Sequence, residues 1–159
     1  MKIGKENGKM YINGYDHPNI IAGQGTMGLE ILEQVPDLDA CIIPIGGAGL
    51  IAGTALAIKS LKPEVQVIGV ESENCPSFAN AMKAGKPIFT ESLSTLADGL
   101  AVSVVGVNAF VTAKDHIDRC VQVKEESIAL EKLPGQDIPQ AILEILHCLI
   151  FFIDRLVVK

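Results

Sequence analysis

A short run of small residues carries the clearest chemical signal in this 159-residue sequence. The run Gly46-Gly47-Ala48-Gly49-Leu50, here named the glycine loop, follows an apolar stretch typical of a buried strand and opens a helical pattern. Residues with little or no side chain let backbone N–H groups approach an anion closely, and a helix N-terminus adds about half an elementary charge. The loop therefore predicts a phosphate site, with tight strand-to-helix packing as the alternative reason for its glycines.

The same residues also fit a dinucleotide. Gly47-x-Gly49-x-x-Ala52 matches the GxGxxG/A fingerprint, and Glu71 falls at the end of the next apolar run. In that arrangement the pyrophosphate lies on the two glycines, and Glu71 accepts hydrogen bonds from a ribose hydroxyl. This alternative predicts the NAD-binding domain of an oxidoreductase, although such a unit is expected earlier in a domain than here.

The remaining residues capable of chemistry have no evident partners. His17 lies in a loop and His116 near a predicted helix end, where an imidazole complements the helix dipole, and neither has a Ser or Cys partner in the pattern. The cysteines show no CxxC spacing, so neither a zinc site nor a disulfide is predicted; they are Cys41, Cys75, Cys120 and Cys148. No residue of the chain is predicted to be catalytic.

Strands and helices alternate along most of the chain. Strands are predicted over residues 10–15, 40–45, 65–70 and 120–123. Helices are predicted over residues 50–61, 78–82, 107–117 and 125–130, with a further helix that follows a turn at residues 23–26 and ends at Pro36. The pattern predicts an α/β fold with an open, mostly parallel sheet and flanking helices.

A second part begins after residue 133, where Pro134-Gly135 interrupts the pattern. The chain is therefore divided into residues 1–133 and a tail, residues 134–159, that is predicted to be an apolar C-terminal helix with one narrow polar stripe. A helix this apolar must be covered by protein, which predicts a homo-oligomer or association through the tail.

Composition excludes several partners. A net charge of −6 and a pI of about 5.0 leave no basic footprint for nucleic acid. Charged residues interrupt the apolar tail, so no membrane span is predicted. The first nine residues are polar and lack the apolar core of a signal peptide, so a cytoplasmic location is expected.

Several segments resemble one family in the same order along the chain. They are residues 20–26 (IIAGQGT), 42–50 with the glycine loop, 67–71 (VIGVE) and 97–102 (ADGLAV). Together they resemble the serine/threonine dehydratases (threonine ammonia-lyases) and serine racemases, which are pyridoxal-phosphate enzymes of fold type II. The resemblance implies that residues 1–133 are part of the catalytic lobe, that the glycine loop holds the cofactor phosphate, and that Tyr15 lies near the substrate side.

The sequence departs from this family in ways that bear on activity. It contains no Ser-Phe-Lys-x-Arg-Gly motif, which supplies the Schiff-base lysine in the family, and no glycine-rich segment with a Ser or Thr for the ring nitrogen. Ala48 replaces the third glycine of the family's usual run. We therefore expect an ammonia-lyase-like fragment for serine or threonine that binds pyridoxal phosphate weakly and is inactive alone. A non-catalytic interaction module is the alternative.

The resemblance also implies a metal candidate at Glu71. Some members of the family bind a divalent cation at this position, with a carbonyl four residues on and an acidic side chain six residues on. Those positions are Cys75 and Ser77 here, so one carboxylate ligand is missing. Glu71 is therefore predicted either as a cation ligand completed by water or as a solvated side chain.

Overall fold

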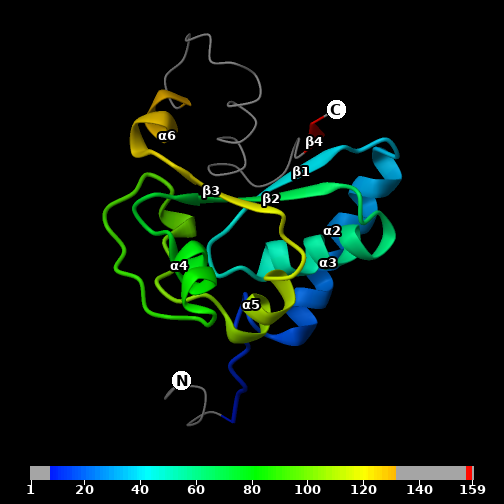
Figure 1. Ribbon diagram of the computed structural model, residues 1–159. Coiled ribbons are helices and arrows are strands. Elements are labelled where there is room, and N and C mark those ends of the chain that lie inside the picture. The colour runs from blue at the N-terminus through cyan, green and yellow to red at the C-terminus, as the bar shows by residue number, and fades with distance from the viewer. Residues whose placement is uncertain (1–7, 132–156, 159) are drawn as a thin grey trace.

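The computed structural model describes residues 8–131 and 157–158. Its elements are α2 (Pro18–Gln34), β1 (Ala40–Pro44), α3 (Gly49–Leu61), β2 (Gln66–Ser72), α4 (Ser77–Ala84), the 3-10 turn η1 (Asp98–Leu100), α5 (Val107–Ala113), β3 (Arg119–Val123), α6 (Glu125–Glu131) and β4 (Val157–Val158). Figure 1 shows α2, α3, α4 and α5 on one side of the sheet and α6 on the other.

The sheet has the strand order β3-β2-β1-β4. β1 pairs with β2 and β2 with β3 in parallel, whereas the short β4 pairs antiparallel with the start of β1. The carboxyl ends of the three parallel strands therefore meet at one edge. This confirms the predicted open, mostly parallel sheet, and the glycine loop begins at that edge because it directly follows β1.

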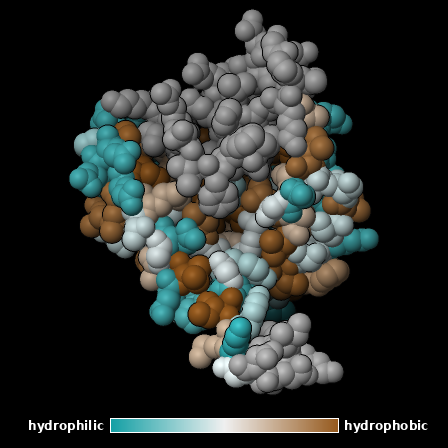
Figure 2. Space-filling view, turned by 180° about the vertical axis from the view of Figure 1, so that it is seen from behind, coloured by the Kyte–Doolittle hydropathy of each residue, from teal (hydrophilic) through white to brown (hydrophobic). Residues whose placement is uncertain are grey.

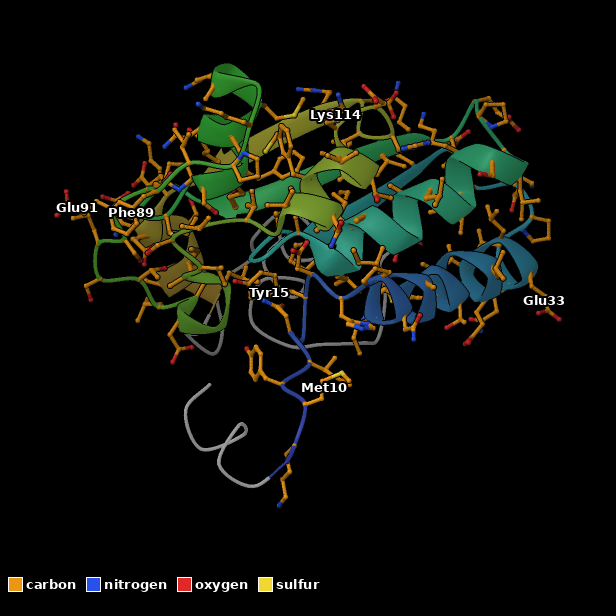
Figure 3. The ribbon with its side chains drawn as sticks, turned by 90° about the horizontal axis from the view of Figure 1, so that it is seen from below. Met10, Tyr15, Glu33, Phe89, Glu91 and Lys114 are labelled. Carbon is orange, nitrogen blue, oxygen red and sulfur yellow. The ribbon has the colours of Figure 1, made fainter. Side chains whose placement is uncertain are left out.

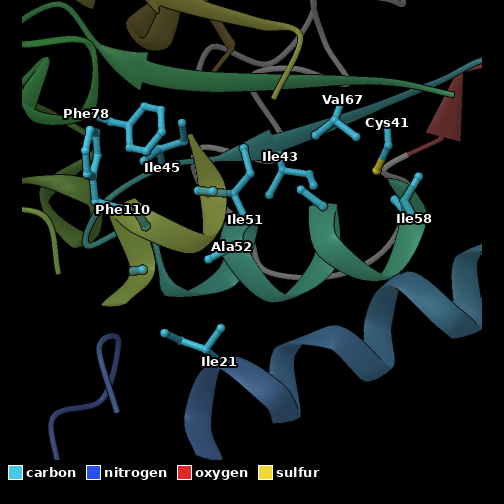
Figure 4. Packing of buried hydrophobic residues seen from close by; sticks show 14 of the residues in the cluster. Ile21, Cys41, Ile43, Ile45, Ile51, Ala52, Ile58, Val67, Phe78 and Phe110 are labelled. Atoms are coloured by element: carbon cyan, nitrogen blue, oxygen red, sulfur yellow. The ribbon is translucent and has the colours of Figure 1, made fainter. Parts of the chain in front are cut away.

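The main core lies between the sheet and its helices (Figure 4). Ile43 and Ile45 come from the β1 region and Ile51 from α3, and all three are almost fully buried. Phe78 and Phe110 join α4 to α5, with ring centroids 5.9 Å apart. Each such side chain contributes about 1.5–3 kcal/mol by leaving water, so this layer fixes the positions of α3, α4 and α5.

Glycines allow α2 and α3 to pack backbone against backbone. A Cβ at Gly53 would overlap the carbonyl of Ile21, and a Cβ at Gly28 would crowd the Thr54 carbonyl. The turn predicted at residues 23–26 is therefore wrong, because these residues lie inside α2 and one of their glycines, Gly25, faces α3. Glycine here serves close helix packing, which outweighs its poor helix propensity.

Other predicted boundaries also change. Residues 10–15 form no strand, because the Asn13 side chain accepts hydrogen bonds from the N–H groups of Tyr15 and Asp16, both at 2.9 Å, and turns the chain. The helix predicted to reach Ile117 ends at Ala113. The predicted helix over 134–159 lies outside the described residues, except that residues 157–158 form strand β4.

Apolar and polar side chains are intermixed on the surface. Figure 2 shows hydrophobic residues reaching one face of the molecule in several places, between hydrophilic ones. Among residues 8–131 and 157–158, no helix is both long enough and apolar enough to cross a bilayer.

Candidate functional site

The glycine loop joins β1 to α3 at the carboxyl edge of the sheet. The last ladder bond before it runs from the Ile45 N–H to the Val70 carbonyl, at 2.8 Å. Gly46 lies against the segment that follows η1, since a Cβ at this position would be 3.2 Å from the Leu100 Cα and 3.4 Å from a Val102 methyl. Two of the segments that carried the family resemblance are thus brought together in space.

The N–H groups of the loop are not used by the described part of the chain. Within residues 8–131, the N–H groups of Gly46 to Leu50 donate no hydrogen bond, and no side chain caps α3. Ala48 has φ 71° and ψ 0°, the left-handed conformation, directly before the right-handed turn of α3. Successive N–H groups in such a pair of conformations form a concave anion-binding nest. The arrangement therefore fits a phosphate group.

Ala48 adopts a backbone conformation that is unfavourable for a residue with a side chain. Its methyl group is 2% exposed and packs in the main core, so it points away from solvent. A left-handed conformation costs a residue with a Cβ about 1–2 kcal/mol. The third glycine of the family's run is thus replaced without loss of the nest, but with local strain.

Glu71 fills the N-terminus of α4. Its two carboxylate oxygens accept hydrogen bonds from the N–H groups of Phe78, at 2.6 Å, and Ala79, at 3.0 Å. The side chain is fully buried. Burial raises the pKa of Glu71 above its usual range, and the two N–H donors and the Cys120 thiol offset part of that rise.

This position leaves Glu71 with no access to a ribose hydroxyl, which goes against the dinucleotide alternative. As for a cation, the Cys75 carbonyl accepts the Ser77 N–H at 2.9 Å, and the buried Ser77 hydroxyl has no partner among the described groups. No group of three or more His, Cys, Asp or Glu side chains in the described residues could hold a metal. The metal role of Glu71 stays a prediction that its geometry does not favour.

The Cys120 thiol lies beside this carboxylate, with its sulfur 3.5 Å from a Glu71 oxygen. Burial, together with the nearby Glu71, raises the pKa of the Cys120 thiol far above its usual range. This environment disfavours the thiolate, which is the nucleophilic form of cysteine. No sequence signal pointed to this pair, because the two residues lie on neighbouring strands.

Tyr15 explains two of the loop's glycines. A Cβ at Gly47 would overlap the Tyr15 ring, and a Cβ at Gly49 would overlap the Tyr15 carbonyl group. Close packing and open N–H groups thus occur in the same loop, so the packing role of these glycines does not exclude an anion site. The sequence placed Tyr15 near the cofactor only through the family resemblance.

The two predicted non-catalytic histidines both have local contacts. His17 is the N-cap of α2, where its Nδ1 accepts the Asn19 N–H at 3.2 Å. His116 Nδ1 lies 2.6 Å from the Thr112 carbonyl. Neither is hydrogen-bonded to a Ser or Cys side chain in the described part of the chain.

A polar cluster that the sequence did not reveal lies at the carboxyl ends of β2 and β3. Glu125, at the start of α6, accepts the Ser72 hydroxyl at 2.6 Å and the Leu96 N–H at 2.9 Å. Burial alone would raise the pKa of Glu125, but these hydrogen bonds hold it below its usual range. The cluster ties the loop before η1 to the ends of β2 and β3.

The surface also has an apolar hollow of about 570 Å³ between α2, α3 and α5. Its lining includes Leu29, Leu56 and Val111 and no titratable side chain. The hollow therefore offers no side chain for acid–base chemistry.

The fold and this loop define a class of protein. Residues 1–130 match the family model described as pyridoxal-phosphate dependent enzyme. The match covers most of the chain, and the chain belongs to this family.

Two relatives show which enzymes of this family the chain is similar to. The chain is 44% identical over 129 residues to L-threonine ammonia-lyase of Thermotoga maritima, which covers 81% of this chain and 32% of that protein. It is 45% identical over 127 residues to the catabolic L-threonine dehydratase TdcB of Escherichia coli K12, covering 80% of this chain and 39% of that protein. The chain thus spans about a third of the length of these relatives.

Solved structures agree. The processed form of threonine deaminase isoform 2 from Solanum lycopersicum superposes with a TM-score of 0.79 at 31% identity, covering 92% of this chain and 46% of that chain. Maize serine racemase superposes with a TM-score of 0.79 at 31% identity, covering 93% of this chain and 46% of that chain. The expected likeness to fold type II pyridoxal-phosphate enzymes is confirmed.

Proposed function

We propose that this chain is the phosphate-holding part of a pyridoxal-phosphate-dependent ammonia-lyase that acts on L-threonine or L-serine. The similarity to threonine ammonia-lyases and dehydratases supports the reaction class. The observation that carries the proposal is the glycine loop at the positive end of α3, whose N–H groups donate to no acceptor in residues 8–131. The N-termini of α4 and α5, in contrast, are each occupied by a carboxylate of the chain.

The bound cofactor would supply an electron sink for the carbanion formed when the amino acid loses its α-proton. The residues of this chain contribute binding and orientation: the N–H groups of Gly46 to Leu50 hold the phosphate, and the core beneath α3 fixes their direction. The chain has no Ser-Phe-Lys-x-Arg-Gly motif, so no residue is assigned the proton transfer. We expect these 159 residues to be inactive alone.

Amide resonances of the isotope-labelled chain give the direct test. Inorganic phosphate and pyridoxal phosphate should each shift the N–H signals of Gly46 to Leu50, while chloride at equal ionic strength should not. The signal of Gly85, at the C-terminal end of α4, serves as an internal control. Adding a side chain at Gly47 is a poorer test, because it would overlap Tyr15 whether or not an anion binds. Unchanged loop signals with both anions would overturn the proposal.

Absorbance tests the expectation that the chain lacks a Schiff-base lysine. Pyridoxal phosphate mixed with the chain should keep the spectrum of the free aldehyde, and borohydride reduction should label no single lysine. Stoichiometric labelling of one lysine would contradict the assignment of an incomplete site.

Partners and location complete the proposal. An amino acid is the substrate of a complete protein of this kind, and we place the chain in the cytoplasm with the metabolic enzymes it resembles. Association through the tail also remains a proposal, because residues 132–156 lie outside the described part. Sedimentation of the full chain and of a chain ending at Glu131 would test it, and equal masses would contradict it.

A further inference from the structure

Tyr15 and Asp16, here named the wedge, lie between the glycine loop and the start of α5. On the loop side, the Tyr15 ring covers the Cα of Gly47, and the Tyr15 carbonyl group covers the Cα of Gly49. These two glycines flank Ala48, the residue in the left-handed conformation. Figure 3 shows Tyr15 against the body of the molecule, whereas Met10 extends away from it.

On the other side, the wedge is fixed to α5. The Asp16 carboxylate accepts the Ala109 N–H at 2.9 Å, and the Asp16 carbonyl accepts the Asn108 side-chain amide at 3.0 Å. The Gly106 N–H in turn donates to the Gly47 carbonyl at 3.1 Å. Loop, wedge and α5 therefore form one closed set of contacts.

Asn13 shapes the wedge before it meets the loop. Its side-chain oxygen accepts the N–H groups of both Tyr15 and Asp16. The wedge is thus a turn held from its own N-terminal side, and its ring is presented to the loop in one orientation. The phenol oxygen of Tyr15 makes no hydrogen bond within residues 8–131, so the contact with the loop is made by the ring and the backbone.

We infer that the wedge positions the glycine loop, so that its N–H groups converge on an anion before the anion arrives. This inference rests on the proposed phosphate site. The wedge contacts the Cα atoms of Gly47 and Gly49 and uses none of the loop's N–H groups, so it supports the nest and leaves its donors open. A loop that is ordered in advance binds more tightly, because binding no longer has to order it.

Phosphate titration of three variants tests the inference by amide shifts. Tyr15→Ala removes the ring and should weaken phosphate binding about tenfold. Tyr15→Phe keeps the ring and should bind like the unsubstituted chain. Ile58→Val, deep in the core at the far end of α3, is the control for lost stability and should bind normally.

The possible outcomes separate the two claims. Weak binding by Tyr15→Ala with normal binding by Tyr15→Phe and Ile58→Val supports the wedge. Equal binding by Tyr15→Ala overturns the wedge and leaves the phosphate site standing. No shift in the unsubstituted chain overturns the phosphate site, and the wedge's role with it.

A double substitution checks the contact itself without any ligand. Gly47→Ala should lower the free energy of unfolding in the unsubstituted chain, because its methyl group meets the ring. In the Tyr15→Ala background the same change should cost much less. Equal costs in the two backgrounds would overturn the wedge contact.

Discussion

The N-termini of α3 and α4 lie at the same edge of the sheet and are treated in opposite ways. At α4 the chain places a buried carboxylate, Glu71, on two N–H groups. At α3 it places no acceptor from the described residues and bends Ala48 into a strained conformation that turns the N–H groups together. A helix start that is filled from within is structural, and one that is kept open suits an external anion.

The largest expected effect comes from removing the Glu71 carboxylate from the N-terminus of α4. Glu71→Ala leaves the Phe78 and Ala79 N–H groups buried without an acceptor, and should lower the free energy of unfolding by about 3 kcal/mol or more. Denaturant titration measures this loss. The exposed neighbour Glu73→Ala is the matched control and should change little. If both variants lose equally, Glu71 does not cap α4.

A second prediction concerns the pH dependence of the same carboxylate. Because the pKa of Glu71 is raised in the folded state, its contribution to stability is complete below its unfolded pKa and is lost as pH rises through the raised folded pKa. Glu71→Gln does not titrate. The stability of the unsubstituted chain relative to Glu71→Gln should therefore fall as pH rises through that window, and a constant difference would contradict the raised pKa.

A smaller effect is expected from removing the backbone strain at Ala48, the residue before α3. Ala48→Gly removes the Cβ from a left-handed residue and should raise the free energy of unfolding by about 1 kcal/mol, with phosphate binding retained. Ala84→Gly, at an exposed position in the last turn of α4, is the matched control and should be destabilising instead. Loss of stability in Ala48→Gly would mean that the methyl group's packing outweighs the strain.

The smallest effect is expected at Glu125, which is partly exposed and screened by solvent. Its pKa is lowered, so its contribution is present above the unfolded pKa and is lost as pH falls through the lowered folded pKa. The advantage of the unsubstituted chain over Glu125→Gln should thus shrink in acid, opposite in direction to Glu71. Acid titration of both proteins by circular dichroism measures this, and a gap that widens in acid would be evidence against it.

The parts of the fold that the sequence predicted correctly are those with local signals. β1 and β2 are continuous apolar runs because they are buried on both faces, and the glycine loop follows β1 directly. The role of Glu71 was not found because its N–H partners lie past a turn in the chain. Gly25 was assigned to a turn because only the approach of α3 explains a glycine there.

The wedge could not be predicted for a related reason. Its contact with the loop joins Tyr15 to Gly47, and its contact with α5 joins Asp16 to Ala109, so neither shows in any local window of sequence. The turn at Asn13 was instead assigned to a strand on the basis of apolar neighbours. Pairings of this kind depend on the finished sheet, which places distant segments side by side.

The hydrogen bond from Ala109 to Asp16 joins residues 93 positions apart. Closing so long a stretch of flexible chain costs about 4 kcal/mol of entropy, which a single hydrogen bond does not recover. The bond becomes favourable only after β1, β2 and β3 have paired and shortened the path between its ends. We therefore expect the loop to acquire its ligand-binding shape in the last stage of folding, so that phosphate would distinguish the native chain from a collapsed intermediate that already has its sheet.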